Sequence, residues 1–253
     1  MRRTVNHSQL SVQLYTVREA MQEDLPGTLA RIAEIGFSQV EPYNFPAFPD
    51  LGQALSAASL SAPTTHAHFV GISDAELNAL FEAGAALGIQ RIIDPHVPAE
   101  RWQSAESVAG IAEQLNAAAL VAARHGVSIG YHNHAHELES VLDGRTSLEV
   151  LVDSLSPEVA LEVDTYWAAV GGQDPVALLR RLGDRVVAIH VKDGAATPEP
   201  KDQTAVGAGT LPIRDIVEAA PSALRVIELD DSRGDRFEAI ADSFAYLTRE
   251  NLA

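Results

Sequence analysis

The chain has 253 residues, of which 46% are hydrophobic and 21% charged; these values are typical of soluble globular proteins and argue against extensive disorder and membrane embedding. The chain has no cysteine, which excludes a disulfide framework, a thiolate metal site and a cysteine nucleophile. Its net charge of -17 opposes nucleic-acid binding, which depends on Lys and Arg neutralising phosphates. No apolar segment follows the two arginines of MRRTVNHSQL, so we expect no secretory signal and a cytoplasmic location.

Short runs of β-branched and aliphatic residues alternate with longer stretches that have helical spacing. The runs predict eight strands, at 11–17, 38–44, 62–69, 91–97, 127–133, 159–165, 185–191 and 225–231. A regular alternation of this kind implies parallel strands joined by right-handed crossovers, and eight such units close most readily into a barrel. We therefore predict one (β/α)8 TIM-barrel domain over residues 1–253. An open doubly wound sheet is the alternative, but the first predicted strand is not followed by the Gly-rich loop typical of that fold.

Glycines mark the ends of several predicted helices. IGF at 35–37, LGI at 87–89 and HGV at 125–127 each place a glycine just before the next strand, where a left-handed helix cap forms easily. The stretch 194–212 is the one long Gly/Pro/Thr-rich interruption, and it is interpreted as a surface loop or lid.

Histidines and carboxylates gather where the predicted strands end. In a β/α barrel, the active site forms at the C-terminal ends of the strands. Each of these residues has an ordinary interpretation as well, such as a hydrogen-bonded histidine or a helix cap. However, three consecutive strands each end in a group that can bind a metal, in EVDTYW, AIHVKD and VIELDD. Because buried carboxylates are costly unless paired or metal-bound, we expect Asp164, His190 and Glu228 to share a metal site.

The chain resembles the xylose isomerase-like TIM barrels over roughly residues 8–250. The resemblance rests on the eightfold repeat and on QLYTVR, YHNH, VDTYW, HVKD and IELD. It implies one divalent ion, most often Mn2+ with Co2+, Mg2+ or Zn2+ as alternatives, held by a Glu, Asp, His, Glu set. Asp164, His190 and Glu228 match the last three positions.

The strand at 127–133 departs from the family pattern. It ends in Tyr131 and His132 where the epimerases of the family have a glutamate. The chain resembles the YHNHxxE subgroup, which makes Glu137 the predicted first ligand and His132 the alternative.

The resemblance implies a sugar isomerase or epimerase that removes a proton next to a carbonyl of a sugar or keto-sugar, a step that a divalent ion assists. We expect His134 to be the base, because an imidazole can take and return a proton near neutral pH, and Glu228 and Lys192 to be further catalytic groups. The predicted substrate-binding residues are His66, His68, His96, His132, Asn133, Tyr43 and Trp167.

Other functions stay open at this point. A dehydratase or lyase, either inosose dehydratase-like or a keto-glycoside β-eliminase, shares the first proton abstraction. An endonuclease IV-like nuclease needs a basic groove, which the charge of -17 disfavours, and a non-catalytic sugar-binding barrel would lack the metal. The expected partner is a small sugar, with neither nucleic acid nor membrane. A homo-oligomer is a further alternative, because the exposed helices of such barrels often pair.

Overall fold

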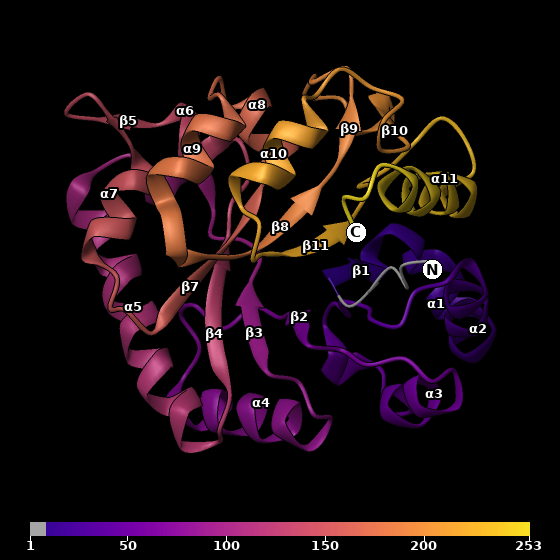
Figure 1. Ribbon diagram of the computed structural model, residues 1–253. Helices are drawn as coiled ribbons and strands as arrows, with labels where there is room; N and C mark the ends of the chain where they lie inside the picture. The colour runs from indigo at the N-terminus through magenta and orange to yellow at the C-terminus, as the bar shows by residue number, and fades with distance from the viewer. Residues whose placement is uncertain (1–8) are drawn as a thin grey trace.

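The computed structural model describes residues 9–253 (Figure 1). Residues 1–8 lie outside the described part; they include the start of the predicted domain and most of the N-terminal segment in which we expect no secretory signal. Parallel strands form one curled sheet in the order β1-β11-β8-β7-β4-β3-β2. Their bounds are β1 Leu10–Val12, β2 Thr64–His66, β3 Arg91–Asp94, β4 Ser128–His132, β7 Val159–Asp164, β8 Val186–Val191 and β11 Leu224–Ile227.

The segment 38–44 fills the gap between β1 and β2. Glu41 bridges to Gln13, directly after β1, and Tyr43 bridges to His66 of β2, both in parallel. The segment forms isolated bridges instead of a regular strand, and one reason is that Pro42 has no N–H to donate to a ladder. The family pattern of eight parallel segments is therefore present, and the predicted TIM-barrel fold is confirmed.

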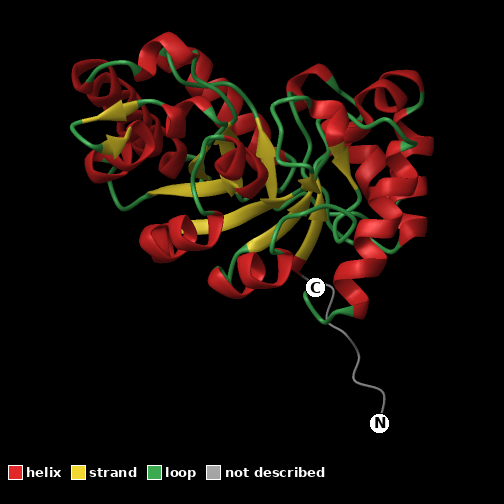
Figure 2. Cartoon of the chain, turned by 90° about the horizontal axis from the view of Figure 1, so that it is seen from above, coloured by secondary structure: helices red, strands yellow, loops and turns green. Residues whose placement is uncertain are grey.

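Helices lie on the outside of the curled sheet (Figure 2). Within residues 9–253, no helix combines the length and the hydrophobicity that crossing a bilayer requires. The bounds of the helices are α1 Arg18–Glu23, α2 Leu25–Ile35, α3 Leu51–Ala57, α4 Asp74–Ala86, α5 Ala105–Arg124, α6 His136–Glu139, α7 Ser147–Ser154, α8 Thr165–Val170, α9 Pro175–Leu182, α10 Ile213–Ala219 and α11 Arg236–Arg249.

Local sequence explains where these helices begin and end. Ser73 starts α4 with a capping box, in which its hydroxyl accepts from the Glu76 amide while the Glu76 carboxylate accepts from the Ser73 amide. Gly88 and Gly126 follow α4 and α5 with φ of 76° and 71°, so the left-handed turns predicted before β3 and β4 are present. Burial of the α5 face that includes Val108, Ile111 and Leu115 then fixes this helix against the barrel.

The loop after β8 lies at the same end of the barrel as α6 and α8 (Figure 1). It contains a short antiparallel pair, β9 Asp193–Gly194 with β10 Gln203–Thr204, and a similar pair, β5 Val141–Leu142 with β6 Arg145–Thr146, follows α6. The buried Asp193 carboxylate accepts four backbone N–H groups, those of Gly194, Gly207, Gly209 and Leu211, at 2.8–3.1 Å. The interruption predicted at 194–212 is thus a loop, and the Asp193 carboxylate holds its backbone in place.

Candidate active site

Strand register places the predicted ligands at one end of the barrel. Asp164 is the last residue of β7 and lies opposite His190 of β8. Glu228 directly follows β11, and Lys192 directly follows β8. Alternate residues of a strand point to the same side, so these side chains meet inside the mouth of the barrel.

Asp164, His190 and Glu228 form the outer cluster. All three are buried, and one donor atom of each lies within 4.8 Å of the others. His190 Nδ1 is 2.6 Å from Glu228 Oε2. The outer cluster predicted from the sequence is therefore brought together in the structure.

The ammonium group of Lys192 lies against the outer cluster. Its Nζ is 2.9 Å from Asp164 Oδ2, 2.7 Å from Glu228 Oε2 and 2.8 Å from Asp230 Oδ2. Burial lowers the pKa of Lys192, but the three carboxylates outweigh burial and hold this pKa well above its usual value. Lys192 is therefore charged, and its charge offsets part of the negative charge of the site.

A second group, which we call the inner cluster, consists of His66, His132, Glu162 and His190. The donor atoms of the four residues lie within 4.8 Å of one another. Glu162 Oε2 is 2.5 Å from His66 Nε2, 3.0 Å from His132 Nδ1 and 3.1 Å from His190 Nε2. A single buried carboxylate oxygen thus orients three imidazoles.

Glu41 completes the surroundings of the inner cluster. Its Oε1 is 2.9 Å from His190 Nε2 and 3.2 Å from His66 Nε2, and it accepts a hydrogen bond from Gln13 Nε2 at 2.8 Å. Its Oε2 has no hydrogen-bond partner. Segment 38–44 therefore closes the barrel and also supplies a carboxylate that holds two histidines in place.

The charges of the inner cluster follow from burial and neighbours. Burial raises the pKa of Glu162, but His190 and His66 outweigh it and hold this pKa well below its usual value. Burial lowers the pKa of His190, yet Glu162 and Glu228 hold it well above its usual value. Burial and the charge of His190 lower the pKa of His132 to about 3. His132 is therefore neutral, and donating from Nδ1 to Glu162 leaves its lone pair on Nε2.

The free nitrogen of His132 faces the outer cluster. His132 Nε2 lies 3.8 Å from Asp164 Oδ2. Asp164 Oδ1 caps α8 by accepting from the Trp167 amide at 2.8 Å, whereas the buried Oδ2 faces the Lys192 ammonium at 2.9 Å. The oxygen already contacts one cation, and the free imidazole nitrogen lies beside it. Carboxylate oxygens and imidazole nitrogens are common metal ligands, so the buried cluster could hold a metal ion.

Glu137, the predicted first ligand, belongs to neither cluster. Its Oε1 accepts from the Tyr131 hydroxyl at 2.7 Å, and its Oε2 accepts from the His134 amide at 2.9 Å. Burial raises the pKa of this carboxyl group to about 7. Both oxygens thus shape the 131–137 turn, and this placement does not support a ligand role. The alternative, His132, does lie beside the outer cluster.

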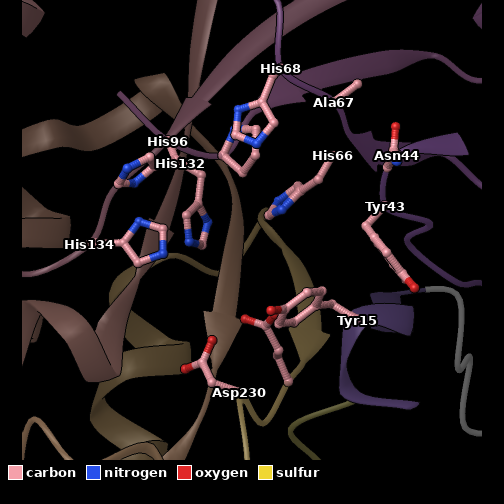
Figure 3. A pocket seen from close by; sticks show the side chains of 12 residues that line it. Tyr15, Tyr43, Asn44, His66, Ala67, His68, His96, His132, His134 and Asp230 are labelled. Carbon is pink, nitrogen blue, oxygen red and sulfur yellow. The ribbon is translucent and has the colours of Figure 1, made fainter. Parts of the chain in front are cut away.

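A cavity of about 310 Å³ opens above these residues. Figure 3 shows His96, His132 and His134 along one side and Tyr15 and Tyr43 along the other. The predicted residues that line the cavity are Tyr43, His66, His68, His96, His132, His134 and Glu228; Tyr15, Asn44, Ala67, Pro95 and Asp230 complete its lining.

Two predicted substrate-binding residues are not part of this lining. Asn133 Oδ1 accepts from the Asp164 amide at 3.1 Å, and this bond ties the end of β4 to the end of β7. Trp167 Nε1 donates to Asp230 Oδ2 at 3.1 Å. The two side chains hold the site's framework together.

His134, the predicted base, lies at the cavity. Its ring lines the cavity, and its buried Nδ1 has no hydrogen-bond partner. Burial lowers its pKa well below the usual value, and the charges of His132 and Lys192 act in the same direction. A neutral imidazole with an unengaged nitrogen can accept a proton.

Among the carboxylates of the site, Glu162 and Asp230 were not predicted from the sequence. Glu162 stands two positions before Asp164 in VALEVD, and the period of two that puts both side chains on one face of β7 was the available signal. Asp230 also accepts from Gln203 Nε2 at 2.7 Å. The available signal for Asp230 was the same spacing, since it stands two positions after Glu228.

The family model described as xylose isomerase-like TIM barrel matches residues 29–247. The chain belongs to this family. A curated relative, the inosose dehydratase of Geobacillus kaustophilus (strain HTA426), is 31% identical over 152 residues, which cover 56% of this chain and 45% of the relative. The chain thus matches less than half the length of that relative.

Solved structures of the xylose isomerase-like fold superpose on nearly the whole chain. A sugar phosphate isomerase/epimerase from Parabacteroides distasonis ATCC 8503 matches with a TM-score of 0.83 and 22% identity, covering 96% of this chain and 94% of that one. The IolI protein, solved with a bound zinc atom, matches with a TM-score of 0.70 and 15% identity, covering 96% and 97%. At these identities, the likeness concerns the fold.

Proposed function

We propose that this family member is a divalent-metal-dependent enzyme that removes a proton next to the carbonyl of a neutral sugar or keto-sugar, as a sugar isomerase or epimerase does. The observation that carries this proposal is the outer cluster beneath the cavity, in which one donor atom each of Asp164, His190 and Glu228 lies within 4.8 Å of the others. His132 Nε2 lies 3.8 Å from Asp164 Oδ2 and adds a second nitrogen. Two nitrogens and two oxygens suit a borderline divalent ion. In this proposal, His132 replaces Glu137 as the first ligand.

The inner cluster supports the assignment. Glu162 binds the far nitrogens of His132 and His190, so it fixes each ring with its other nitrogen toward the outer cluster. Metal-bound histidines usually carry such a carboxylate on their second nitrogen. When bound, a divalent ion would polarise a substrate carbonyl and stabilise the negative charge left by proton removal. We keep manganese as the expected ion, and the zinc in the IolI structure is consistent with the same donor types.

His134 is the proposed base. It lines the cavity beside His132, with ring centroids 5.1 Å apart, and its Nδ1 is free to accept a proton. Glu228 also lines the cavity and can contact a substrate hydroxyl. A role for Lys192 in holding a substrate oxygen stays a prediction.

The lining of the cavity supports an uncharged substrate. Among the described residues, none that lines the cavity is Arg or Lys, and the nearby Lys192 is already paired with three carboxylates. A phosphorylated sugar would place two negative charges near Glu228 and Asp230 without a free cation. We therefore propose an unphosphorylated polyhydroxy carbonyl compound.

Dehydration is the second candidate function. The inosose dehydratase relative supports it, and so does the presence of His134, a single imidazole that lines the cavity. An imidazole on one face of the substrate can take the proton and return it to a leaving hydroxyl. Both candidates begin with the same proton abstraction.

Proton exchange tests this step directly. Wild-type protein supplied with Mn2+ should exchange the proton next to the carbonyl of an inosose or an unphosphorylated keto-hexose for deuterium, measured by proton NMR in D2O. Replacing His134 with Gln should slow this exchange by about 100-fold without loss of bound metal. His125→Gln is the matched control, because His125 bonds Asn78 away from the cavity. Exchange at the wild-type rate in His134→Gln would refute the base assignment. If metal-loaded wild type exchanges no substrate, the function itself is wrong.

A further inference from the structure

A second cavity, of about 370 Å³, lies at the opposite end of the barrel. Its lining includes Thr64, Arg91 and Ser128, which are the first residues of β2, β3 and β4. The candidate active site lies instead where strands end. The two cavities share no lining residue among those described, so this second cavity is separate from the proposed catalytic one.

Arg91 gives the second cavity a positive charge without a partner. Within residues 9–253, the Arg91 guanidinium forms no hydrogen bond and no ion pair, and its Nε is buried. No described Asp or Glu lines the cavity. Glu162 attracts the charge of Arg91 electrostatically without contacting it. The Glu162 carboxylate is already bound by three histidines. A partly buried cation without a partner is costly, and it is unexpected in a chain with 35 acidic and 18 basic residues.

Unpaired neutral groups gather at the same place. The Thr64 side chain is buried with 5% exposure, and its Oγ1 has no hydrogen-bond partner. Gln39 also lines the cavity, and its buried Oε1 lacks a partner. Most buried polar atoms in native proteins are paired. Three orphaned polar groups around one cavity therefore point to a ligand with several polar atoms.

We propose that this cavity binds a small oxyanion, a phosphate or carboxylate group, through the Arg91 guanidinium and the Thr64 hydroxyl. Arg presents parallel N–H groups that match two oxygens of such an anion. A hydrogen phosphate ion can in addition donate to the Gln39 oxygen, which sulfate cannot do. The proposal goes beyond the proposed function and does not depend on it.

Calorimetric titration of the full-length protein with inorganic phosphate tests the site, with chloride at matched ionic strength as the reference. We expect saturable binding of one phosphate per chain, weakened at least tenfold in Arg91→Gln. Arg233→Gln is the matched control, because Arg233 is exposed and pairs with Asp202 in a loop outside this cavity. Sulfate should bind more weakly than phosphate if Gln39 accepts from the ligand.

Two results would overturn the proposal. One is the absence of saturable phosphate binding to wild type, which would mean that water alone satisfies these groups. The other is equal binding by wild type and Arg91→Gln, which would place the anion elsewhere. Should Arg91→Gln fail to fold, Thr64→Val decides the matter, because it removes one hydroxyl and keeps the shape: weakened binding supports the site and unchanged binding refutes it. None of these results depends on catalysis.

Discussion

Glu162→Gln is expected to cost about 3–5 kcal/mol of folding free energy and to weaken divalent metal binding by about 10–100-fold. Glutamine has the shape of glutamate but not its charge. Oε2 of Glu162 now lies within 3.1 Å of nitrogens from three histidines, and a neutral amide would leave the charge of His190 without that partner. The substitution would also weaken the hydrogen bond that fixes the orientation of the His132 ring.

Two measurements check this expectation. Urea unfolding followed by circular dichroism gives the stability, and competition with a chelating dye gives the metal affinity. Glu139→Gln is the matched control, because Glu139 is an exposed carboxylate of α6. A Glu162→Gln protein as stable as wild type, with unchanged metal affinity, would show that the inner cluster neither stabilises the barrel nor orients the ligands.

Lys192→Met should destabilise the protein by roughly 3–5 kcal/mol in the presence of a chelator. The substitution keeps most of the side-chain volume but removes the one ammonium group that contacts Asp164, Glu228 and Asp230. Three carboxylates would then repel one another in a buried setting. Because a divalent ion would bind the same Asp164 and Glu228 oxygens, adding Mn2+ should raise the unfolding temperature more in Lys192→Met than in wild type.

Thermal unfolding with and without Mn2+ measures both effects. The chain's other lysine, Lys201, is exposed, so Lys201→Met serves as the control. If Lys192→Met unfolds at the wild-type temperature in chelator, the ammonium group does not offset these carboxylates.

The fold was predictable because it is encoded in local patterns. Alternating strand and helix patterns, with glycines such as Gly88 and Gly126 at helix ends, are sufficient to predict the repeated strand–helix unit without knowledge of tertiary contacts. The segment 38–44 was the least regular part, since Pro42 interrupts its ladder. Its role as the closing segment depends on pairing with β1 and β2, which no local pattern could specify.

The site was predictable only in part. Asp164, His190 and Glu228 follow from their positions at strand ends. The Glu137 prediction rests on spacing along the chain, which does not reveal that the Tyr131 hydroxyl and the His134 amide occupy its oxygens. Glu162 was not predicted because it lies below the strand end, inside the barrel. A carboxylate is rare at such a buried position unless several partners bind it. Such partners, His66, His132 and His190, come from three different strands and are visible only in three dimensions.

Metal content by elemental analysis tests the central claim most directly, on protein purified without chelator. We predict one divalent ion per chain in wild type, loss of the ion in Asp164→Asn and His132→Gln, and retention in Glu137→Gln. Wild type without metal would contradict the proposed function, and metal lost in Glu137→Gln but kept in His132→Gln would return the first ligand to Glu137.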